Sequence, residues 1–116
     1  MKKVLLAAVI AAWTGHVFAK TGNELLDEIR SSDRVRSGLG HITGEDVTKA
    51  GVWLGFIQGV SWTLDDIDPR VCLPRSGTTG QSAAVVKQYL EQNPAQLHRP
   101  AHVLVREALQ RAFPCR

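Results

Sequence analysis

Apolar residues recur at helical spacing in four segments beyond residue 20. The last segment begins near Pro100, a favoured first-turn residue, and has the most regular pattern. The third spans about Thr79 to Gln92 and ends before Pro94, which cannot continue a helix. The residues expected to point inward from these two helices are Ala83, Val86, Tyr89, Leu90, Ala101, Leu104, Val105, Ala108, Leu109 and Ala112. No useful stretch alternates as a strand does, so the pattern predicts an all-α fold, a small four-helix bundle-like domain.

A longer apolar segment, from about Gly44 to Ile67, predicts a second helix at the centre of the domain. It stops before Pro69 and is apolar around most of its circumference. Such a pattern is typical of a helix in the middle of a bundle. The residues expected to face its neighbours are Val47, Ala50, Trp53, Leu54, Phe56, Ile57, Val60, Leu64 and Ile67.

Three glycines, Gly51, Gly55 and Gly59, recur every four residues on one side of this central helix. Each costs up to about 1 kcal/mol relative to alanine, so a compensating close approach of another backbone is expected. In a membrane helix this spacing favours a dimer seam, but the acidic end at Asp65 and Asp66 argues against lipid. We expect packing against another helix of the same chain, with a subunit interface as the alternative.

The first predicted helix is short and places Leu25, Leu26 and Ile29 on one face. The stretch from Ser31 to His41 is rich in Ser, Arg and Gly, a composition typical of loops. We therefore expect this helix to fray just after Arg30 and to be followed by a mobile surface loop.

A threonine three residues before an acid or amide precedes three of the four helices. The pairs are Thr21 with Glu24, Thr43 with Asp46, and Thr78 with Gln81. This spacing predicts a capping box, in which the threonine oxygen accepts the third helical N–H and the later side chain reaches back to the threonine backbone. Because each pair comes directly before an apolar periodic run, the three together predict three helix starts.

Residues 1–19 have the pattern of a secretory signal peptide. Lys2 and Lys3 precede the apolar run from Val4 to Trp13, and small residues at Val17 and Ala19 mark a cleavage site. The alternative, an uncleaved membrane anchor, needs roughly 20 apolar residues, and this run is shorter. We expect cleavage after Ala19, a periplasmic location, and a mature domain of residues 20–116 that does not contact the membrane.

Loss of the two signal lysines lowers the net charge from +3 to about +1. Basic residues are spread along the chain without a stripe, which argues against nucleic-acid binding. Both cysteines, Cys72 and Cys115, lie in the mature part, where an oxidising compartment favours a disulfide. Two cysteines allow only one intramolecular pairing, so the sequence predicts a single bridge.

Chemistry-bearing residues are sparse. His98 and His102 could in principle join the two cysteines in a zinc site, but His98 precedes Pro100 and should lie outside the helix. Oxidation of the thiols would also remove two ligands. The serines lie in no recognisable nucleophile motif. We therefore expect neither catalysis nor a metal or other cofactor.

Several fragments, in order, resemble the Rap/Tai family of immunity proteins that accompany type VI secretion amidases. They are Gly22-Asn-Glu-Leu-Leu26, Trp53-Leu-Gly-Phe-Ile-Gln-Gly-Val60, Cys72-Leu-Pro74, Thr78-Thr-Gly-Gln81, Val85-Val-Lys-Gln-Tyr-Leu90, Pro94 and Ala108-Leu-Gln-Arg-Ala-Phe-Pro-Cys115. The resemblance covers nearly the whole mature chain and supports pairing of Cys72 with Cys115. Family members often carry two further cysteines near Ile29 and Trp53, so it also suggests an apolar Ile29–Trp53 contact in place of a second bridge.

The resemblance implies a periplasmic inhibitor, often a homodimer, that occupies the cleft of a peptidoglycan-cleaving amidase, its cognate effector. Binding residues concentrate on loops held by rigid elements, so the two segments between helices are the expected contacts. The first candidate set is Arg70, Arg75 and Ser76 beside the disulfide, and the second is Arg34, Arg36 and His41. Two other functions stay open: a small acid-stress chaperone of the periplasm and a structural protein of the envelope.

Overall fold

The computed structural model of the chain describes residues 19–116, so the predicted signal peptide lies outside it apart from Ala19. Its elements are four α-helices and one short 3-10 helix. They are α2 (Gly22–Ser37), α3 (Gly44–Ile67), α4 (Thr79–Gln92), η1 (Pro94–Gln96) and α5 (Ala101–Ala112). Within the described residues no strand forms, and the predicted all-α class is confirmed. No helix in this part of the chain is long and apolar enough to cross a membrane.

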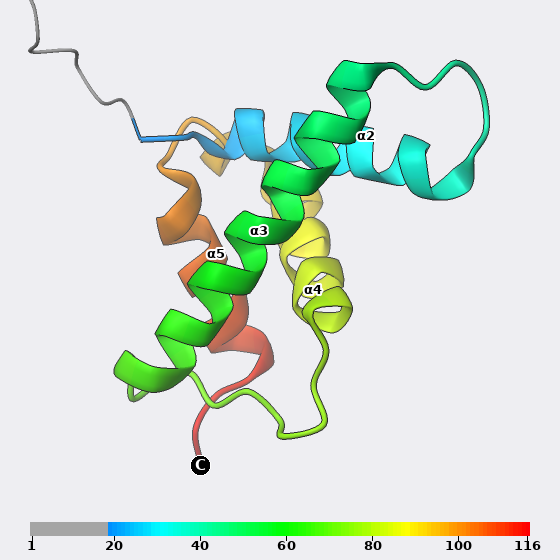
Figure 1. Cartoon of the computed structure of the whole chain (residues 1–116). Helices are drawn as coiled ribbons and strands as arrows, with labels where there is room; N and C mark the ends of the chain where they lie inside the picture. Colours follow the sequence, from blue (N-terminus) through cyan, green and yellow to red (C-terminus); the bar gives the residue numbers. More distant parts are fainter. Residues whose placement is uncertain (1–18) are drawn as a thin grey trace, which may run out of the picture.

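The helices α3, α4 and α5 run alongside one another, and α2 lies across their upper end (Figure 1). The chain passes down α3, turns through residues 68–78 at the lower end, returns along α4 and descends again in α5 to the C-terminus. Residues just before α2 pair with the segment before α5, since Gly22 N donates to Arg99 O (3.0 Å) and Ala101 N donates to Lys20 O (2.7 Å).

All three predicted capping boxes form, and they explain why α2, α3 and α4 begin where they do. In each, the threonine oxygen accepts the N–H of the third helical residue, and that residue's side chain accepts the threonine N–H. The predicted bounds Gly44–Ile67 and Thr79–Gln92 are those of α3 and α4. The short η1 at Pro94 was not predicted.

One core joins the four helices. Its fully buried side chains come from every helix and from Val71 in the 68–78 segment, and include Leu25, Ile29, Ile57, Val86, Leu90, Leu104, Val105 and Leu109. The inward residues predicted for α4 are all buried, as are those for α5 except Ala112. Ile29 and Trp53 are each 2% exposed and belong to this core cluster. They occupy the positions at which the family resemblance suggests an apolar contact.

The expected loop from Ser31 to His41 is wrong in its first half, because α2 continues to Ser37. Ser31 and Ser32 are buried (0% and 6% exposed), and the Ser31 hydroxyl accepts a hydrogen bond from Arg34 Nη2 (2.8 Å). The packing of the domain therefore buries both serines, and Arg34 of the same helix satisfies the Ser31 hydroxyl, although serine favours a loop in isolation. The helix ends at Gly38, whose φ of 63° is the left-handed conformation that glycine adopts readily.

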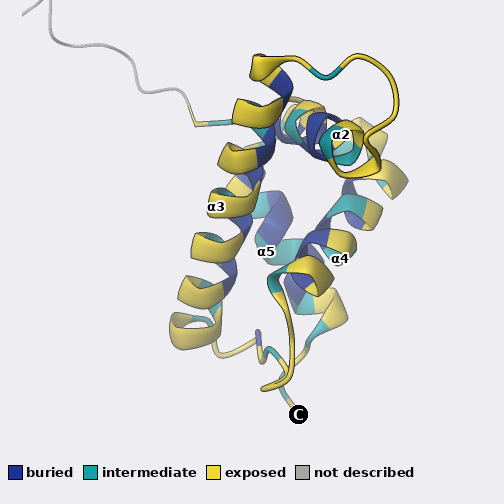
Figure 2. Ribbon diagram, turned by 45° about the vertical axis from the view of Figure 1, so that its right-hand side comes forward, coloured by how far each residue is buried: buried dark blue, intermediate teal, exposed yellow. Residues whose placement is uncertain are grey.

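The expected position of α3 in the middle of a bundle is also wrong. Figure 2 shows α3 exposed along its outer side, with its buried residues confined to the side facing the other helices. Val47, Leu54 and Ile67 are 55%, 42% and 71% exposed, although their spacing predicted burial. The bundle covers only one side of this helix, so an apolar sequence on the other side remains in contact with solvent.

The three glycines of α3 lie on this outer side. A Cβ added at Gly51, Gly55 or Gly59 would meet no atom of the described residues within 4 Å, so none of the helices α2, α4 and α5 packs closely against them. The expected intrachain contact is therefore wrong.

Candidate protein-binding site

The segment between α3 and α4 begins with a turn that its own side chains stabilise. Asp68 accepts hydrogen bonds from the Arg70 backbone N–H (3.0 Å) and from Gln110 Nε2 on α5 (2.8 Å). The Arg70 guanidinium is the main cause that lowers the pKa of Asp68 to about 2, and these two hydrogen bonds contribute to the same shift. Val71, which is 1% exposed, inserts into the core. The segment is thus tied to α5 and to the core.

The next residues are fixed to both neighbouring helices. Cys72 forms the predicted disulfide with Cys115, with a Cα–Cα distance of 5.0 Å, and its N–H donates to Phe113 O (2.9 Å). Leu73 N donates to Asp65 Oδ1 near the end of α3 (2.7 Å). The backbone leading to Pro74 is therefore anchored on two sides by covalent and hydrogen bonds.

A tight turn follows from Pro74 to Gly77. Gly77 N donates to Pro74 O (2.7 Å), the bond that closes a β-turn and puts Arg75 and Ser76 at its two central positions. Both are exposed, and within residues 19–116 neither side chain forms an ion pair or hydrogen bond. The turn thus presents a free guanidinium and a free hydroxyl on an anchored backbone.

Arg70, the third residue of the first candidate set, lies at the base of this segment. Its side chain is 67% exposed, and its Nε lies 3.2 Å from Asp68 Oδ1. It therefore helps to shape the segment, and only part of its guanidinium remains available to a partner.

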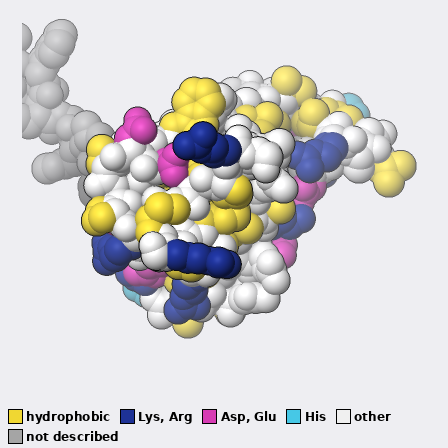
Figure 3. Space-filling view, turned by 90° about the horizontal axis from the view of Figure 1, so that it is seen from below, with side chains coloured by type: hydrophobic (Ala, Val, Ile, Leu, Met, Phe, Trp, Pro, Cys, Tyr) yellow, Lys and Arg dark blue, Asp and Glu magenta, His cyan; other side chains and the backbone are white. Residues whose placement is uncertain are grey.

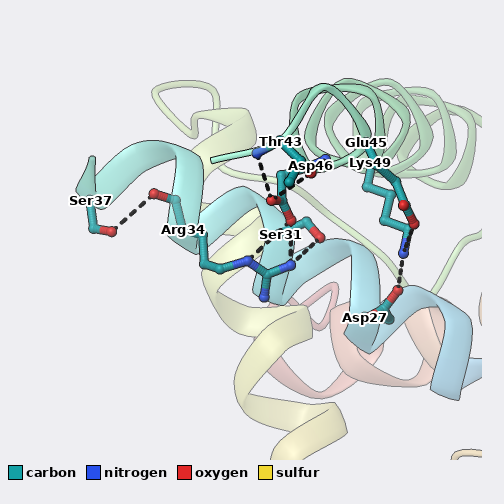
Figure 4. Close-up of polar contacts among 8 residues, drawn as sticks. All are labelled: Asp27, Ser31, Arg34, Ser37, Thr43, Glu45, Asp46 and Lys49. Atoms are coloured by element: carbon teal, nitrogen blue, oxygen red, sulfur yellow. Dashed lines mark hydrogen bonds and ion pairs between the residues drawn. The ribbon is translucent and has the colours of Figure 1, made fainter. Parts of the chain in front are cut away.

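The second candidate set lies at the other end of α3. Arg34 reaches from α2 to the start of α3, where it pairs with Asp46 and also contacts Ser31 (Figure 4). Asp46 accepts the Thr43 N–H as well (3.1 Å), and the guanidinium holds its pKa far below the usual range. Arg34 is thus engaged in joining α2 to α3, whereas Arg36 and His41 are exposed.

The two candidate sets do not form one patch. They lie beyond opposite ends of α3, whose 24 residues span about 36 Å. The 70–76 segment combines free polar groups with the better anchored backbone, so we assign the candidate site to it.

A hollow of about 230 Å³ lies directly beside the turn. It is lined by Ser61, Trp62, Leu73, Pro74, Gly77, Thr78, Thr79, Gln81, Ser82 and Phe113. Neither Ser61 nor Trp62 was predicted from the sequence as a site residue. No local signal marks them, because the hollow is completed by residues 73–82, which are distant from both in sequence.

Metal-ligating residues do not gather in the part of the chain that the structure describes. No group of three or more His, Cys, Asp or Glu side chains there could hold a metal ion. His98 lies before α5, outside any helix, as predicted, and both cysteine sulfurs are in the disulfide.

Comparison with known proteins identifies a family. The model of a family described as Rap1a immunity proteins matches residues 21–115, which is nearly the whole described chain. No curated protein matches this sequence.

Proposed function

The chain belongs to the Rap1a immunity protein family, and we propose that it protects its cell in the periplasm by inhibiting a peptidoglycan amidase delivered by type VI secretion. The family makes it an immunity protein directed against a secreted effector. The amidase target, the compartment and the mode of binding are our proposal, and inhibition by occupancy requires no catalysis by this chain.

The observation that carries the proposal is the anchored turn from Pro74 to Gly77. Binding costs less when the contacting segment is already ordered, because little conformational entropy is lost on association. The disulfide and the hydrogen bonds of Cys72 and Leu73 supply that order. A projecting turn of this kind suits insertion into a concave enzyme cleft.

Arg75 and Ser76 provide the chemistry for such an insertion. A guanidinium donates up to five hydrogen bonds and pairs well with carboxylates, and a serine hydroxyl both donates and accepts. Both groups are free of side-chain contacts with the described residues, so neither must break such a contact to bind. We propose that they bind polar groups in the amidase cleft around its catalytic Cys–His pair and so exclude the substrate.

The proposal is tested with the effector encoded beside this gene, purified and mixed with the mature protein. Arg75→Glu should weaken binding at least about tenfold, as expected for a charged residue central to an interface. Arg30→Glu makes the same charge change at an exposed position of α2, distant from the turn, and should leave the affinity within about twofold. Equal affinities for both variants would exclude the turn as the contact.

Export is tested in cells that send the effector to the periplasm. The full chain should protect them, whereas a chain lacking residues 1–19 should not, because a cytoplasmic inhibitor cannot meet a periplasmic enzyme. If the exported protein neither protects cells nor co-purifies with the effector, the immunity proposal is wrong. Suppression of aggregation at about pH 2–3 would then test the chaperone alternative.

We further propose that a homodimer forms through the outer side of α3. Residues 50–64 contain no charged side chain, and the glycines would let a second α3 approach closely. Val52, which is 47% exposed, lies on this side. In sedimentation equilibrium, Val52→Lys should shift the protein toward monomer. Gln88→Lys, at an exposed position of α4, should not; equal behaviour of the two variants would exclude this interface.

A further inference from the structure

The hollow beside the turn joins an apolar wall to a polar end. Trp62 from α3, Leu73 and Phe113 supply apolar surface, and the first turn of α4 supplies the polar end. Its volume of about 230 Å³ far exceeds the roughly 10–15 Å³ that a single water needs. Figure 3, which views the molecule from below, shows hydrophobic side chains grouped on this face with Lys and Arg side chains beside them.

One backbone donor that lines the hollow, at the start of α4, has no acceptor among the described residues. Thr78 caps the helix by accepting the N–H of Gln81 (3.2 Å), which leaves the N–H group of Thr79 unpaired. The first turn carries no acidic side chain, and no charged residue lines the hollow. A helix N-terminus carries partial positive charge, so this end favours an anion.

Ser61 provides an independent sign that a ligand belongs here. It lines the same hollow from α3, is only 2% exposed, and its Oγ has no hydrogen-bond partner in the described structure. A buried hydroxyl without a partner destabilises the fold, and a ligand oxygen in the hollow would satisfy it.

From these observations we propose that the hollow binds the carboxylate of a glutamate or aspartate side chain of the partner effector. The carboxylate accepts the Thr79 N–H and the Ser61 hydroxyl, and its methylene groups pack against Trp62 and Phe113. This inference rests on the proposed function, because the partner is the effector that the adjacent turn contacts. The turn and the hollow then form one continuous surface.

The site is tested first without the effector, by NMR titration with N-acetyl-glutamate N-methylamide. The glutamine counterpart, which has the same shape and no charge, is the control probe. Saturable shifts of the Thr79 amide signal are expected with the glutamate probe only. No shift, or equal shifts with both probes, would overturn the assignment of a carboxylate site.

Thr79 offers a matched pair of variants. It is the first residue of α4, where proline is well tolerated, and Thr78 has φ −111° and ψ 155°, which suits a residue before proline. Thr79→Pro removes one N–H donor, whereas Thr79→Ala keeps it. We expect Thr79→Pro to weaken probe binding roughly tenfold relative to Thr79→Ala, as for loss of a hydrogen bond to a charged group.

Ser61→Ala separates a role of Ser61 in binding from a role in stability. The variant should be as stable as the parent or more stable, because it removes an unpartnered buried hydroxyl, yet it should bind the probe several-fold more weakly. A loss of stability with unchanged probe binding would refute the role of Ser61 as a ligand-binding group.

The same variants are then measured with the effector. If the parent protein binds the effector and Thr79→Pro binds it as tightly as Thr79→Ala, the partner's side chain does not enter the hollow, although the immunity function stands. If the parent protein does not bind the effector, the proposed function fails. In that case the titration alone decides whether the hollow takes free carboxylates, and the assignment to a partner side chain fails with the function.

Discussion

Gly55→Ala should stabilise the monomer of this protein, although the spacing of the α3 glycines first indicated the opposite. A Cβ at Gly55 meets no atom within 4 Å, so the new methyl group causes no clash. Alanine is favoured over glycine in a helix interior by about 0.5–1 kcal/mol, chiefly because it restricts the unfolded chain. For a domain of this size the melting temperature should rise by roughly 2–8 °C.

The same substitution at Gly22 is the control, and it should act in the opposite direction. A Cβ at Gly22 would lie 2.9 Å from Leu97 O and 2.5 Å from Leu104 Cδ1, in the tightly packed start of α2. Such overpacking typically destabilises by about 1–3 kcal/mol. The pair therefore separates the effect of space from the effect of residue type.

The stability of both variants is measured by thermal and urea unfolding at a series of protein concentrations, with circular dichroism as the signal. At high dilution, where a homodimer dissociates, Gly55→Ala should be more stable than the parent. A lower stability restricted to high concentration would indicate that a second copy packs on the glycines. A lower stability at every concentration would refute the reasoning, because it requires a contact within the chain.

Other changes have equally defined outcomes. Cys115→Ser should lower the free energy of unfolding by about 2–5 kcal/mol in urea titrations, since the disulfide closes a long loop. Arg34 lowers the pKa of Asp46, so this carboxylate stabilises the fold above about pH 4 and the contribution is lost as the pH falls; Asp46→Asn should flatten the acid loss of stability. Intact mass of periplasmic protein should show a chain that begins at Lys20, and retention of Met1 to Ala19 would overturn the predicted cleavage.

Local signals predicted the starts of three helices well, because a capping box is complete within four residues. Thr43 and Asp46, or Thr78 and Gln81, satisfy each other without help from distant segments. The C-terminal ends of α3 and α4 were also predicted well from the sequence, since Pro69 and Pro94 exclude a longer helix.

The errors came from features that distant residues decide. Ser31 is helical because α2 packs on α3, and because Arg34, which reaches Asp46 at the start of α3, also donates to the Ser31 hydroxyl; the local composition does not show these contacts with α3. The exposure of Leu54 depends on how many helices surround α3, and the apolar periodicity of α3 does not contain that information. For the same reason the sequence alone could not separate an intrachain contact at Gly55 from a free surface.

The candidate site was predicted only in part. Proximity to the disulfide indicated the 70–76 segment. Whether an arginine side chain is paired depends on contacts between elements, however: Arg34 pairs with Asp46 of α3, whereas Arg75 has no such partner among the described residues. Ser61 lines the hollow together with residues between 73 and 82, which are distant from it in sequence. No local pattern around Ser61 could therefore predict that it lines a hollow.

The disulfide ties the formation of the turn to a cysteine 43 residues further along the chain. A chain that stops before Cys115 cannot form the bridge, so it cannot anchor the turn in its final form. Synthesis through Cys115 and oxidation of the two thiols are thus both required before the turn is anchored, and a product that lacks either step does not present it.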